Sequence, residues 1–325
     1  MPDATVVIVT RNRCEELRGA VASAMAQEGS VEVLVMDDAS EDATGELVRS
    51  EFPDARLVRF EERAGLVVRR NDAARLASGD VIVSIDDDAT FSSSRCVAQT
   101  LADFDDPRIA AVAIPMVEII AGESDEPAAA PATEHEPERQ GTPGAGPWVV
   151  PIFRGTSYAM RRDVFLALGG FREQIVHQGE EPDFCLRMLA AGYVVARGRA
   201  DHICHRPSAH RDLERMDVYG RRNELLLAYT FFPVPIAAAL MCGYTAKGLR
   251  HGMRVGRTGA MLRGTAAGAR ACWAMRRERQ PLTWRLAAVD RRLRRAGALP
   301  LSELEGQLPP ARFSHQALAA AAAAV

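Results

Sequence analysis

Residues 81–88 read Val-Ile-Val-Ser-Ile-Asp-Asp-Asp, an apolar run that ends in three consecutive carboxylates. The apolar part has the length and the β-branched content of a short buried strand. Side chains alternate between the two faces of a strand, so Asp86 and Asp88 are predicted to point one way and Asp87 the other. Two carboxylates on one side repel each other unless a cation lies between them. The stretch therefore predicts either an acidic pair suited to Mg²⁺ or Mn²⁺ or, as the alternative, a solvated acidic turn.

Strand-like runs and helix-like stretches alternate on the amino-terminal side of these acids. Four βα-type repeats fit within the first 90 residues, which is typical of a doubly wound α/β fold with a mostly parallel sheet flanked by helices. Ligands of such sheets bind at the carboxyl ends of the strands, where both Asp38 and Asp86 are expected to lie. The strand-like runs are residues 5–9, 31–36, 57–60 and 81–85.

Length and composition are those of an ordinary globular chain. It has 325 residues, of which 47% are hydrophobic and 26% charged, enough for one large core or for one and a half domains. Its six cysteines are scattered, without the short paired spacing of a zinc site or a disulfide framework. The amino terminus lacks the pattern of a signal peptide. We therefore expect a cytoplasmic protein.

The first strand is followed by Thr10-Arg11-Asn12-Arg13, where a dinucleotide-binding protein would carry a Gly-rich turn. The sequence has no P-loop either, so dinucleotide-dependent oxidoreductases and P-loop phosphotransferases are disfavoured. Nucleotide binding as such stays open. Asp38 can accept hydrogen bonds from a base or a ribose, and the planar guanidinium of Arg70 suits a diphosphate.

Four motifs, in the order in which they occur, together resemble the family 2 glycosyltransferases of the GT-A fold. That family transfers sugars from nucleotide-sugar donors, and the resemblance covers roughly residues 4–230. It implies that Asp86 and Asp88 hold a metal ion against the diphosphate of the donor. The motifs are Val6–Arg13, Val35–Thr44, Arg69–Asn71 and Ile85–Asp88.

The resemblance also implies which residues bind the donor. Thr10 and Asp38 would line the pocket for the base and the ribose, and Arg70 would approach the donor. A strand end, a helix cap or a solvated helix residue is the alternative at these positions. Asp37 and Asp87 stay ambiguous, because a one-residue error in register would exchange them with their neighbours. The expected donor-binding residues are Thr10, Asp38, Arg70, Asn71, Asp86 and Asp87.

An acidic pair lies within the predicted acceptor half, residues 148–230. Pro182 suits the first turn of a helix, and the acids before it lie at the positive end of that helix. The resembling family has Glu-Asp here, with the second acid as catalytic base, so Glu181 takes that role and Glu180 is the reserve. A carboxylate that is one methylene longer can still remove the proton of an acceptor hydroxyl. Stabilisation of the helix end is the alternative role for both acids.

His205 is the candidate third metal ligand. The segment His205–Ser208 resembles the family's His-x-x-Ser segment, and a neutral imidazole is a common partner of carboxylates around Mn²⁺. His202 is the rival candidate, and a structural role is the alternative for either histidine.

Residues 121–147 contain five prolines, six acids and one base, a composition typical of a loop. Loops of this length inside a compact domain tend to be lids or binding elements. We expect either a lid that closes over the acceptor or an insertion without such a role.

The carboxyl-terminal region, residues 231–325, is expected to be helical and basic. Between Lys247 and Arg295 it has 14 Lys or Arg and two acids, although the whole chain has a net charge of −3. Three arginines recur every seven residues opposite an apolar stripe, as in a basic amphipathic helix. The arginines are Arg263, Arg270 and Arg277, and the stripe includes Met261, Leu262, Cys272 and Trp273.

This basic pattern has two interpretations. Residues 231–295 contact an anionic membrane surface, or the helix packs its apolar side on the catalytic domain and leaves the arginines solvated. The apolar run 231–242 is too short, and too interrupted by proline, to span a membrane. No nucleic-acid partner is expected, because no recognition motif accompanies the charge.

We therefore predict a GT-A domain at residues 1–230, with a donor half at 1–117, followed by the helical region 231–325. The predicted activity is metal-dependent transfer of a sugar from a UDP-, dTDP- or GDP-linked donor to a hydroxyl acceptor, with inversion inferred from the resemblance. A cell-surface glycan or a lipid-linked precursor is the expected acceptor. The enzyme would work in the cytoplasm, either free or attached to the inner face of the cell membrane.

Two other functions stay open. A sugar-phosphate nucleotidyltransferase has a related sheet, but that class expects a Gly-rich loop with a lysine after the first strand, and the only lysine here is Lys247. A non-catalytic protein that binds nucleotide-sugars or glycans would keep the fold without turnover. The Glu-Glu pair in place of Glu-Asp is the only support for that alternative.

Overall fold

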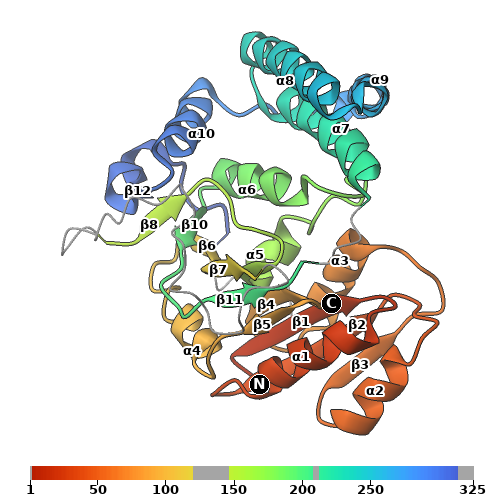
Figure 1. The fold of residues 1–325 in the computed structure, drawn as a ribbon. Coiled ribbons are helices and arrows are strands. Elements are labelled where there is room, and N and C mark those ends of the chain that lie inside the picture. Colours follow the sequence, from red (N-terminus) through yellow and green to blue (C-terminus); the bar gives the residue numbers. More distant parts are fainter. Residues whose placement is uncertain (1, 120–145, 208–211, 314–325) are drawn as a thin grey trace.

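A nine-stranded sheet forms the centre of the molecule (Figure 1). The computed structural model describes residues 2–119, 146–207 and 212–313, and within them the strand order is β12-β8-β10-β6-β9-β4-β1-β2-β3. All strands of this sheet except β8 and β9 run in the same direction, so the predicted mostly parallel sheet is confirmed. The strands are β1 (Ala4–Thr10), β2 (Val31–Asp37), β3 (Arg56–Arg59), β4 (Val81–Asp86), β6 (Ile109–Ala113), β8 (Trp148–Val150), β9 (Ser157–Arg161), β10 (Val194–Arg197) and β12 (Leu299–Pro300).

The register of the central strands brings the carboxyl ends of β1, β2 and β4 to one edge. β1 pairs in parallel with β2 on one side and with β4 on the other, which places Thr10 opposite Asp37 and Val9 opposite Asp86. The three strands are almost entirely buried, since they are apolar on both faces as expected of a sheet covered on each side. The acids at the ends of β2 and β4 therefore lie at the same sheet edge as Thr10.

Helices cover both faces of the sheet. Val6 and Ile8 of β1 belong to one apolar core with Leu17, whereas Val7 belongs to a second core with Val67. Alternate residues of one strand thus enter two cores, which confirms the doubly wound arrangement. The helices of this part are α1 (Cys14–Met25), α2 (Thr44–Glu51), α3 (Leu66–Leu76), α4 (Cys96–Leu101), α5 (Arg162–Ala167) and α6 (Glu180–Ala190).

A second, three-stranded sheet continues from the acidic end of β4. Only Asp86 belongs to β4, because Asp87 and Asp88 form a turn that leads into β5. The prediction that strand alternation orients all three acids was therefore wrong. Asp86 and Asp88 do come together, but the turn sets the direction of Asp88. β5 pairs with β11, and His205 lies opposite Ala89. The strands are β5 (Ala89–Phe91), β7 (Met116–Glu118) and β11 (Ile203–His205).

Three long helices, α7 (Leu213–Phe231), α8 (Val234–Val255) and α9 (Thr258–Ala274), pack together at one end of the molecule (Figure 1). Two glycines let α9 approach α7 closely. A Cβ atom at Gly264 would lie 2.7 Å from the carbonyl oxygen of Val218, and one at Gly268 would lie 2.9 Å from Cδ1 of Leu225. The predicted helical carboxyl-terminal extension is thus confirmed.

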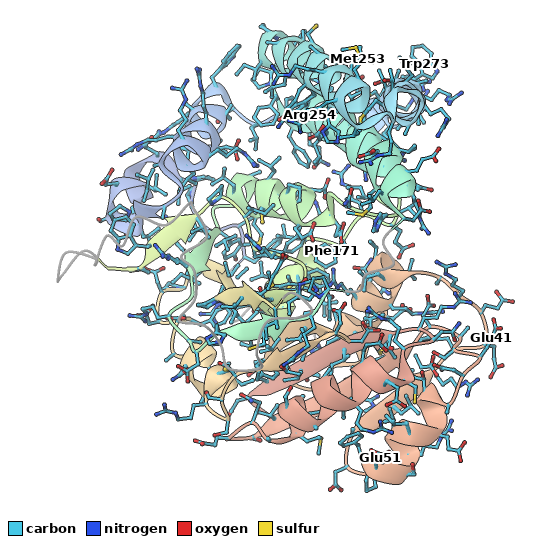
Figure 2. The ribbon with its side chains drawn as sticks, in the orientation of Figure 1. Glu41, Glu51, Phe171, Met253, Arg254 and Trp273 are labelled. Atoms are coloured by element: carbon cyan, nitrogen blue, oxygen red, sulfur yellow. The ribbon has the colours of Figure 1, made fainter. Side chains whose placement is uncertain are left out.

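The predicted amphipathic pattern of α9 is wrong in part. The helix ends at Ala274, so Arg277 lies in the 3-10 turn Arg276–Glu278 that follows. Leu262 and Trp273 are 54% and 71% exposed, outside the packed face. Glycines occupy that face because small side chains let two helices approach closely. Trp273 lies with Met253 and Arg254 at the α8–α9 end of the molecule (Figure 2).

The last described segment returns to the main sheet. α10 (Trp284–Ala296) leads into β12, which pairs with β8 at the edge of the sheet. Within the described ranges, no helix combines the length and the apolar character that crossing a membrane requires. The predicted loop, residues 121–147, lies outside the described residues except for its last two positions.

Candidate active site

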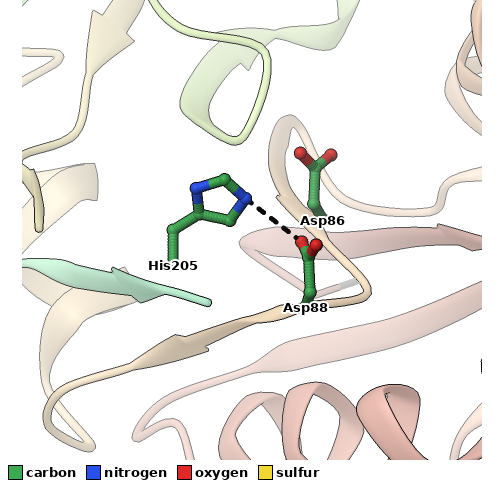
Figure 3. Close-up of side chains that lie close together, drawn as sticks. All are labelled: Asp86, Asp88 and His205. Atoms are coloured by element: carbon green, nitrogen blue, oxygen red, sulfur yellow. Dashed lines mark ion pairs between the residues drawn. The ribbon is translucent and has the colours of Figure 1, made fainter. Parts of the chain in front are cut away.

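Asp86, Asp88 and His205 form a cluster that could hold a metal ion (Figure 3). One ligand atom from each residue lies within 4.8 Å of the others. The cluster depends on the small sheet, because the amide of Arg206 donates to the carbonyl oxygen of Asp88 at 2.9 Å and so fixes β11 beside the acidic turn. Of the two candidate histidines, the structure brings His205 to the acids.

Asp88 is held from two sides, by the imidazole of His205 and by the guanidinium of Arg13. Its Oδ1 lies 3.3 Å from Nε2 of His205, and its Oδ2 accepts from Nη2 of Arg13 at 2.9 Å. Burial acts to raise the pKa of Asp88, but the hydrogen bond from His205 and the charge of Arg13 outweigh it and hold the pKa below its usual range. Asp88 is therefore a carboxylate, as a metal ligand must be.

Arg13 is a site residue that the sequence reasoning missed. It donates to Oδ1 of Asp87 at 2.7 Å, and Thr10 donates to Oδ2 of the same carboxylate at 2.9 Å. Burial raises the pKa of Asp87 to about 7, against the effect of Arg13. Thr10 and Asp87, both expected to bind the donor, thus contact each other, and Asp87 is not one of the three residues of the cluster. The position of Arg13 at the end of the Thr10–Arg13 motif was the available signal.

Arg70 links the metal-ligand cluster to the acidic pair of α6. This side chain is buried, and its Nη2 donates to Oδ1 of Asp86 at 2.9 Å and to the carbonyl oxygen of Gly155 at 2.7 Å. Its Nη1 lies 3.5 Å from Oε1 of Glu180. Thr156 donates to the other oxygen of Asp86 at 2.7 Å, so both oxygens of that acid are fixed in direction.

Glu180 and Glu181 are the first two residues of α6. A helix amino terminus ordinarily favours ionised acids, but burial works in the opposite direction here. Burial raises the pKa of Glu180, and burial together with the neighbouring charge of Glu180 raises the pKa of Glu181 to about 7. A Cβ atom at Gly155 would clash with Oε1 of Glu181 and lie 3.1 Å from Nη1 of Arg70. Glu181 therefore lies beside the Arg70 link.

The turn before α6 has a backbone that few residues adopt. Gln178 has φ +61° and Gly179 has φ +110°, both in the left-handed region. Asn223 of α7 donates from its amide to the carbonyl oxygen of His177 at 2.9 Å and so supports this turn. α7, the first of the three long helices, thus positions the acidic pair.

Asp38 anchors the segment that leads into α3. Its two oxygens accept from the amides of Ala64 and Gly65, each at 2.8 Å, and from Nε of Arg69 at 2.7 Å. Burial would raise the pKa of Asp38, but these hydrogen bonds outweigh it and lower the pKa. Contact of Asp38 with a base or a ribose stays a prediction.

Asn71 connects α3 to the backbone of Phe171, in the segment between α5 and α6. Its amide nitrogen donates to the carbonyl oxygen of Phe171 at 2.9 Å, and its amide oxygen accepts from the Phe171 backbone at 2.8 Å. Gly170, with φ +66°, leaves no room for a side chain, since a Cβ atom there would lie 2.6 Å from Oδ1 of Asn71. Contact of Asn71 with a donor stays a prediction.

The comparison with known families agrees with this geometry. Residues 5–169 match the family described as Glycosyl transferase family 2, which is half of the chain. The chain belongs to glycosyl transferase family 2. The expected family membership is therefore confirmed.

Two curated relatives of this family 2 chain are named for biosynthetic roles. Succinoglycan biosynthesis protein ExoO of Rhizobium meliloti (strain 1021) is 39% identical over 98 residues, which are 29% of this chain and 28% of that protein. The Pre-mycofactocin glycosyltransferase of Mycobacterium tuberculosis (strain ATCC 25618 / H37Rv) is 27% identical over 232 residues, which are 67% of this chain and 46% of that protein. The chain thus spans less than half the length of either relative.

Solved structures of glycosyltransferases have the same fold as this family 2 member. The mannosyltransferase PcManGT of Pyrobaculum calidifontis, in complex with GDP-Man and Mn²⁺, has a TM-score of 0.54 and 21% identity, covering 99% of this chain and 86% of that one. S. aureus TarS 1-349, in complex with UDP-GlcNAc, has a TM-score of 0.55 and 15% identity, covering 77% of this chain and 73% of that one. The GT-A fold class is thus confirmed.

Proposed function

We propose that this glycosyltransferase is metal-dependent and inverting, and that it moves a sugar from a nucleoside-diphosphate sugar to an acceptor hydroxyl. The observation that carries the proposal is a buried cation between two acidic sites. Arg70 contacts Asp86 of the metal-ligand cluster and approaches Glu180 at the start of α6. A donor whose diphosphate lies at the cluster would direct its sugar toward Glu181.

The residues of the cluster fit Mn²⁺ or Mg²⁺. Two carboxylates and an imidazole suit these ions, and each carboxylate oxygen keeps a lone pair after the hydrogen bonds described above. The ring nitrogen of His205 that faces Asp88 is Nε2, at 3.3 Å, whereas Nδ1 points away from both acids and lies 3.9 Å from Oε1 of Glu118 (Figure 3). Asp86, Asp88 and His205 would hold the ion, which when bound neutralises charge on the leaving diphosphate.

Glu181 is the proposed catalytic base. Its carboxylate takes the proton of the acceptor hydroxyl while that oxygen attacks the anomeric carbon, on the side opposite to the diphosphate. The bond between the anomeric carbon and the diphosphate oxygen breaks, so the configuration inverts. A base with a pKa of about 7 suits proton transfer near neutral pH. Glu180, which raises that pKa and approaches Arg70, is the reserve candidate.

The donor pocket is proposed to lie along the carboxyl ends of β1, β2 and β4. Arg70 and Asp86 would face the diphosphate end of the donor. Asp38 would act by holding residues 63–65 as one wall for the base and ribose, and Asn71 by holding Phe171. Thr10 would contribute by holding Asp87, and Asp87 by holding Arg13, which also contacts Asp88. UDP, dTDP and GDP sugars are the candidate donors.

The proposed acceptor is a hydroxyl of a cell-surface glycan or of a lipid-linked precursor. Three observations favour a site at the inner face of the cell membrane. Trp273 is 71% exposed and Met253 67% exposed, and arginines such as Arg254 and Arg270 accompany them on the same two helices. Apolar and basic side chains together suit an anionic membrane surface.

Donor turnover tests the proposal directly. UDP-, GDP- and dTDP-sugars are incubated with the purified protein in Mn²⁺, Mg²⁺ or EDTA, with and without hydroxyl acceptors, and nucleoside diphosphate release is measured. We expect release from one nucleotide class, loss in EDTA, and a product of inverted anomeric configuration by NMR. Release that EDTA leaves unchanged contradicts metal dependence, and a retained configuration contradicts inversion. Nucleotide binding without turnover of any donor would favour the non-catalytic alternative.

A further inference from the structure

A cavity between α8 and α10 takes no part in the proposed reaction. Its volume is about 570 Å³, within the range of roughly 300–1,000 Å³ typical of small-molecule sites. One wall comes from residues three and four apart on α8 and the turn before it, so a single helix face lines the cavity. We call this cavity the α8–α10 groove. Its apolar wall consists of Phe232, Pro235, Ile236, Ala239 and Leu240.

The α8–α10 groove explains the apolar run at residues 231–242. The two prolines do not interrupt a helix there, since Pro233 is the N-cap of α8 and Pro235 lies in its first turn. No charged residue occurs from residue 234 to 246. Pro235 and Ala239 of the groove wall are exposed, and Ile236 is only partly buried. The α8 side of the groove is thus an open apolar surface.

Arginines form the other side of the α8–α10 groove. Arg291, Arg294 and Arg295 of α10 line it together with the buried acid Asp290. Nε of Arg294 lies 3.0 Å from each carboxylate oxygen of Asp290, so this acid is neutralised within its own helix. Arg291 and Arg295 are exposed, and neither has an acidic partner among the residues that the structure describes. Two guanidinium groups are left to bind an anion.

We infer that the α8–α10 groove binds a single hydrocarbon chain that carries a phosphate head. The α8 wall selects methylene groups, because it offers no hydrogen-bonding side chain before Tyr244 at its end. A nucleotide or an extended peptide would leave polar groups unpaired there. On α10, guanidinium groups match phosphate oxygens with charge-assisted, bidentate hydrogen bonds. The chain of the ligand lies on α8 and its phosphate on Arg291 and Arg295.

This chemistry has two sources in a cell. One is a phospholipid of the bilayer, and the other is the lipid phosphate that carries the acceptor. The second source rests on the proposed function, whereas binding of the amphiphile does not. In either case the α8–α10 groove holds the enzyme and a membrane-borne molecule together while the donor site stays in water.

Calorimetry with short-chain probes tests the inference on the full chain. Dodecyl phosphate is titrated below its micelle concentration, with dodecanol and inorganic phosphate as the two half-ligands. Ala239→Trp fills the apolar wall from an exposed position, and Arg291→Glu/Arg295→Glu reverses the charge of the rim. Arg49→Glu on α2, an exposed arginine outside the groove and outside the proposed membrane surface, is the matched control. Thermal unfolding checks that each variant is folded.

Dodecyl phosphate should bind. Dodecanol lacks the charge-assisted contact with the arginines, and inorganic phosphate lacks the buried methylenes. Each should therefore bind at least about tenfold more weakly than dodecyl phosphate. Ala239→Trp and the double arginine variant should each weaken binding by about tenfold or more, and Arg49→Glu should not. No binding overturns the inference, as does equal binding of dodecanol. Equal binding by folded Ala239→Trp and by the wild type overturns it too.

Competition identifies the source of the ligand. A polyprenyl phosphate that displaces dodecyl phosphate where phosphatidic acid does not assigns the groove to the acceptor, and displacement by both assigns it to bilayer phospholipid. Displacement by neither overturns the inference. Mn²⁺-dependent nucleotide binding is measured on the same samples. If nucleotide binds and dodecyl phosphate does not, the groove inference fails while the proposed function stands. If dodecyl phosphate binds and no nucleotide does, the proposed function fails while the groove inference stands.

Discussion

Replacement of Glu181 by glutamine keeps the shape of the side chain and removes its ability to accept a proton. In the proposed reaction this carboxylate takes the proton of the acceptor hydroxyl. Loss of a positioned general base costs about 10²–10⁴-fold in rate, which is about 3–5 kcal/mol of activation free energy. The pH profile should change as well. Wild-type activity should fall as pH drops below about 7, because burial and Glu180 raise the pKa of Glu181 to about 7 and the protonated acid is not a base.

The same substitution should stabilise the protein at high pH. The pKa of Glu181 is about 7 in the folded state and ordinarily 4.5, so the folded state binds this proton more tightly than the unfolded chain does. Ionisation of Glu181 therefore does not lower the free energy of unfolding below pH 4.5. The loss of stability grows between pH 4.5 and 7 and is complete above pH 7. A difference of about 2.5 in pKa corresponds to at most about 3 kcal/mol. The glutamine of Glu181→Gln does not ionise, so the variant does not lose this stability at high pH.

The assay combines turnover with thermal unfolding at pH 5 and pH 8. Glu46→Gln, an exposed acid in the first turn of α2, is the matched control and should resemble the wild type in both. Glu181→Gln should lose turnover and should melt at a higher temperature than the wild type at pH 8, with a smaller difference at pH 5. Turnover equal to the wild type would refute the assignment of the base. If Glu180→Gln alone loses turnover, the reserve acid is the base.

Three further substitutions test the contacts around the site. Arg13→Ala removes the cation that holds Asp88 and Asp87, so Mn²⁺ affinity should weaken about 10- to 100-fold, with partial recovery in Arg13→Lys; unchanged affinity would show that Arg13 does not position the ligands. Gly155→Ala places a Cβ atom against Glu181 and should lower kcat more than it raises KM for the donor, and a change in KM alone would contradict this. Asn71→Ala leaves the Phe171 backbone amide and carbonyl unpaired, which should lower the free energy of unfolding by about 1–3 kcal/mol per buried group in chemical denaturation, and an unchanged midpoint would count against the link.

The fold could be predicted from the sequence because it depends on the local periodicity of apolar residues. The βα repeats before residue 90 have apolar strands and amphipathic helices, and these patterns suffice to predict a doubly wound sheet. The carboxyl ends of parallel strands meet at one edge, so Asp86 could be placed at a ligand-binding edge without a structure. His205 was found through a motif, since no periodicity relates it to Asp88.

Contacts between distant residues could not be predicted in this way. Arg13 lies more than 70 positions before Asp87 and Asp88, and only the parallel pairing of β1 with β4 brings them together. The direction of Asp88 depends on pairing of β5 with β11, two short strands that have no pattern of their own. The face of α9 that packs was also missed. Glycines carry that contact, and a search for large apolar residues passes over them.

Metal-dependent nucleotide binding tests the central claim most directly. UDP, GDP, dTDP and CDP are added to the wild type, to Asp88→Ala and to the exposed control Asp54→Ala, each with and without Mn²⁺, and thermal unfolding is followed. The donor-site account predicts that one nucleotide stabilises the wild type and the control only with Mn²⁺, by about 2.7 kcal/mol at 100 times its Kd, and that Asp88→Ala loses this effect. Stabilisation that is independent of Mn²⁺, or that Asp88→Ala retains in full, would contradict it.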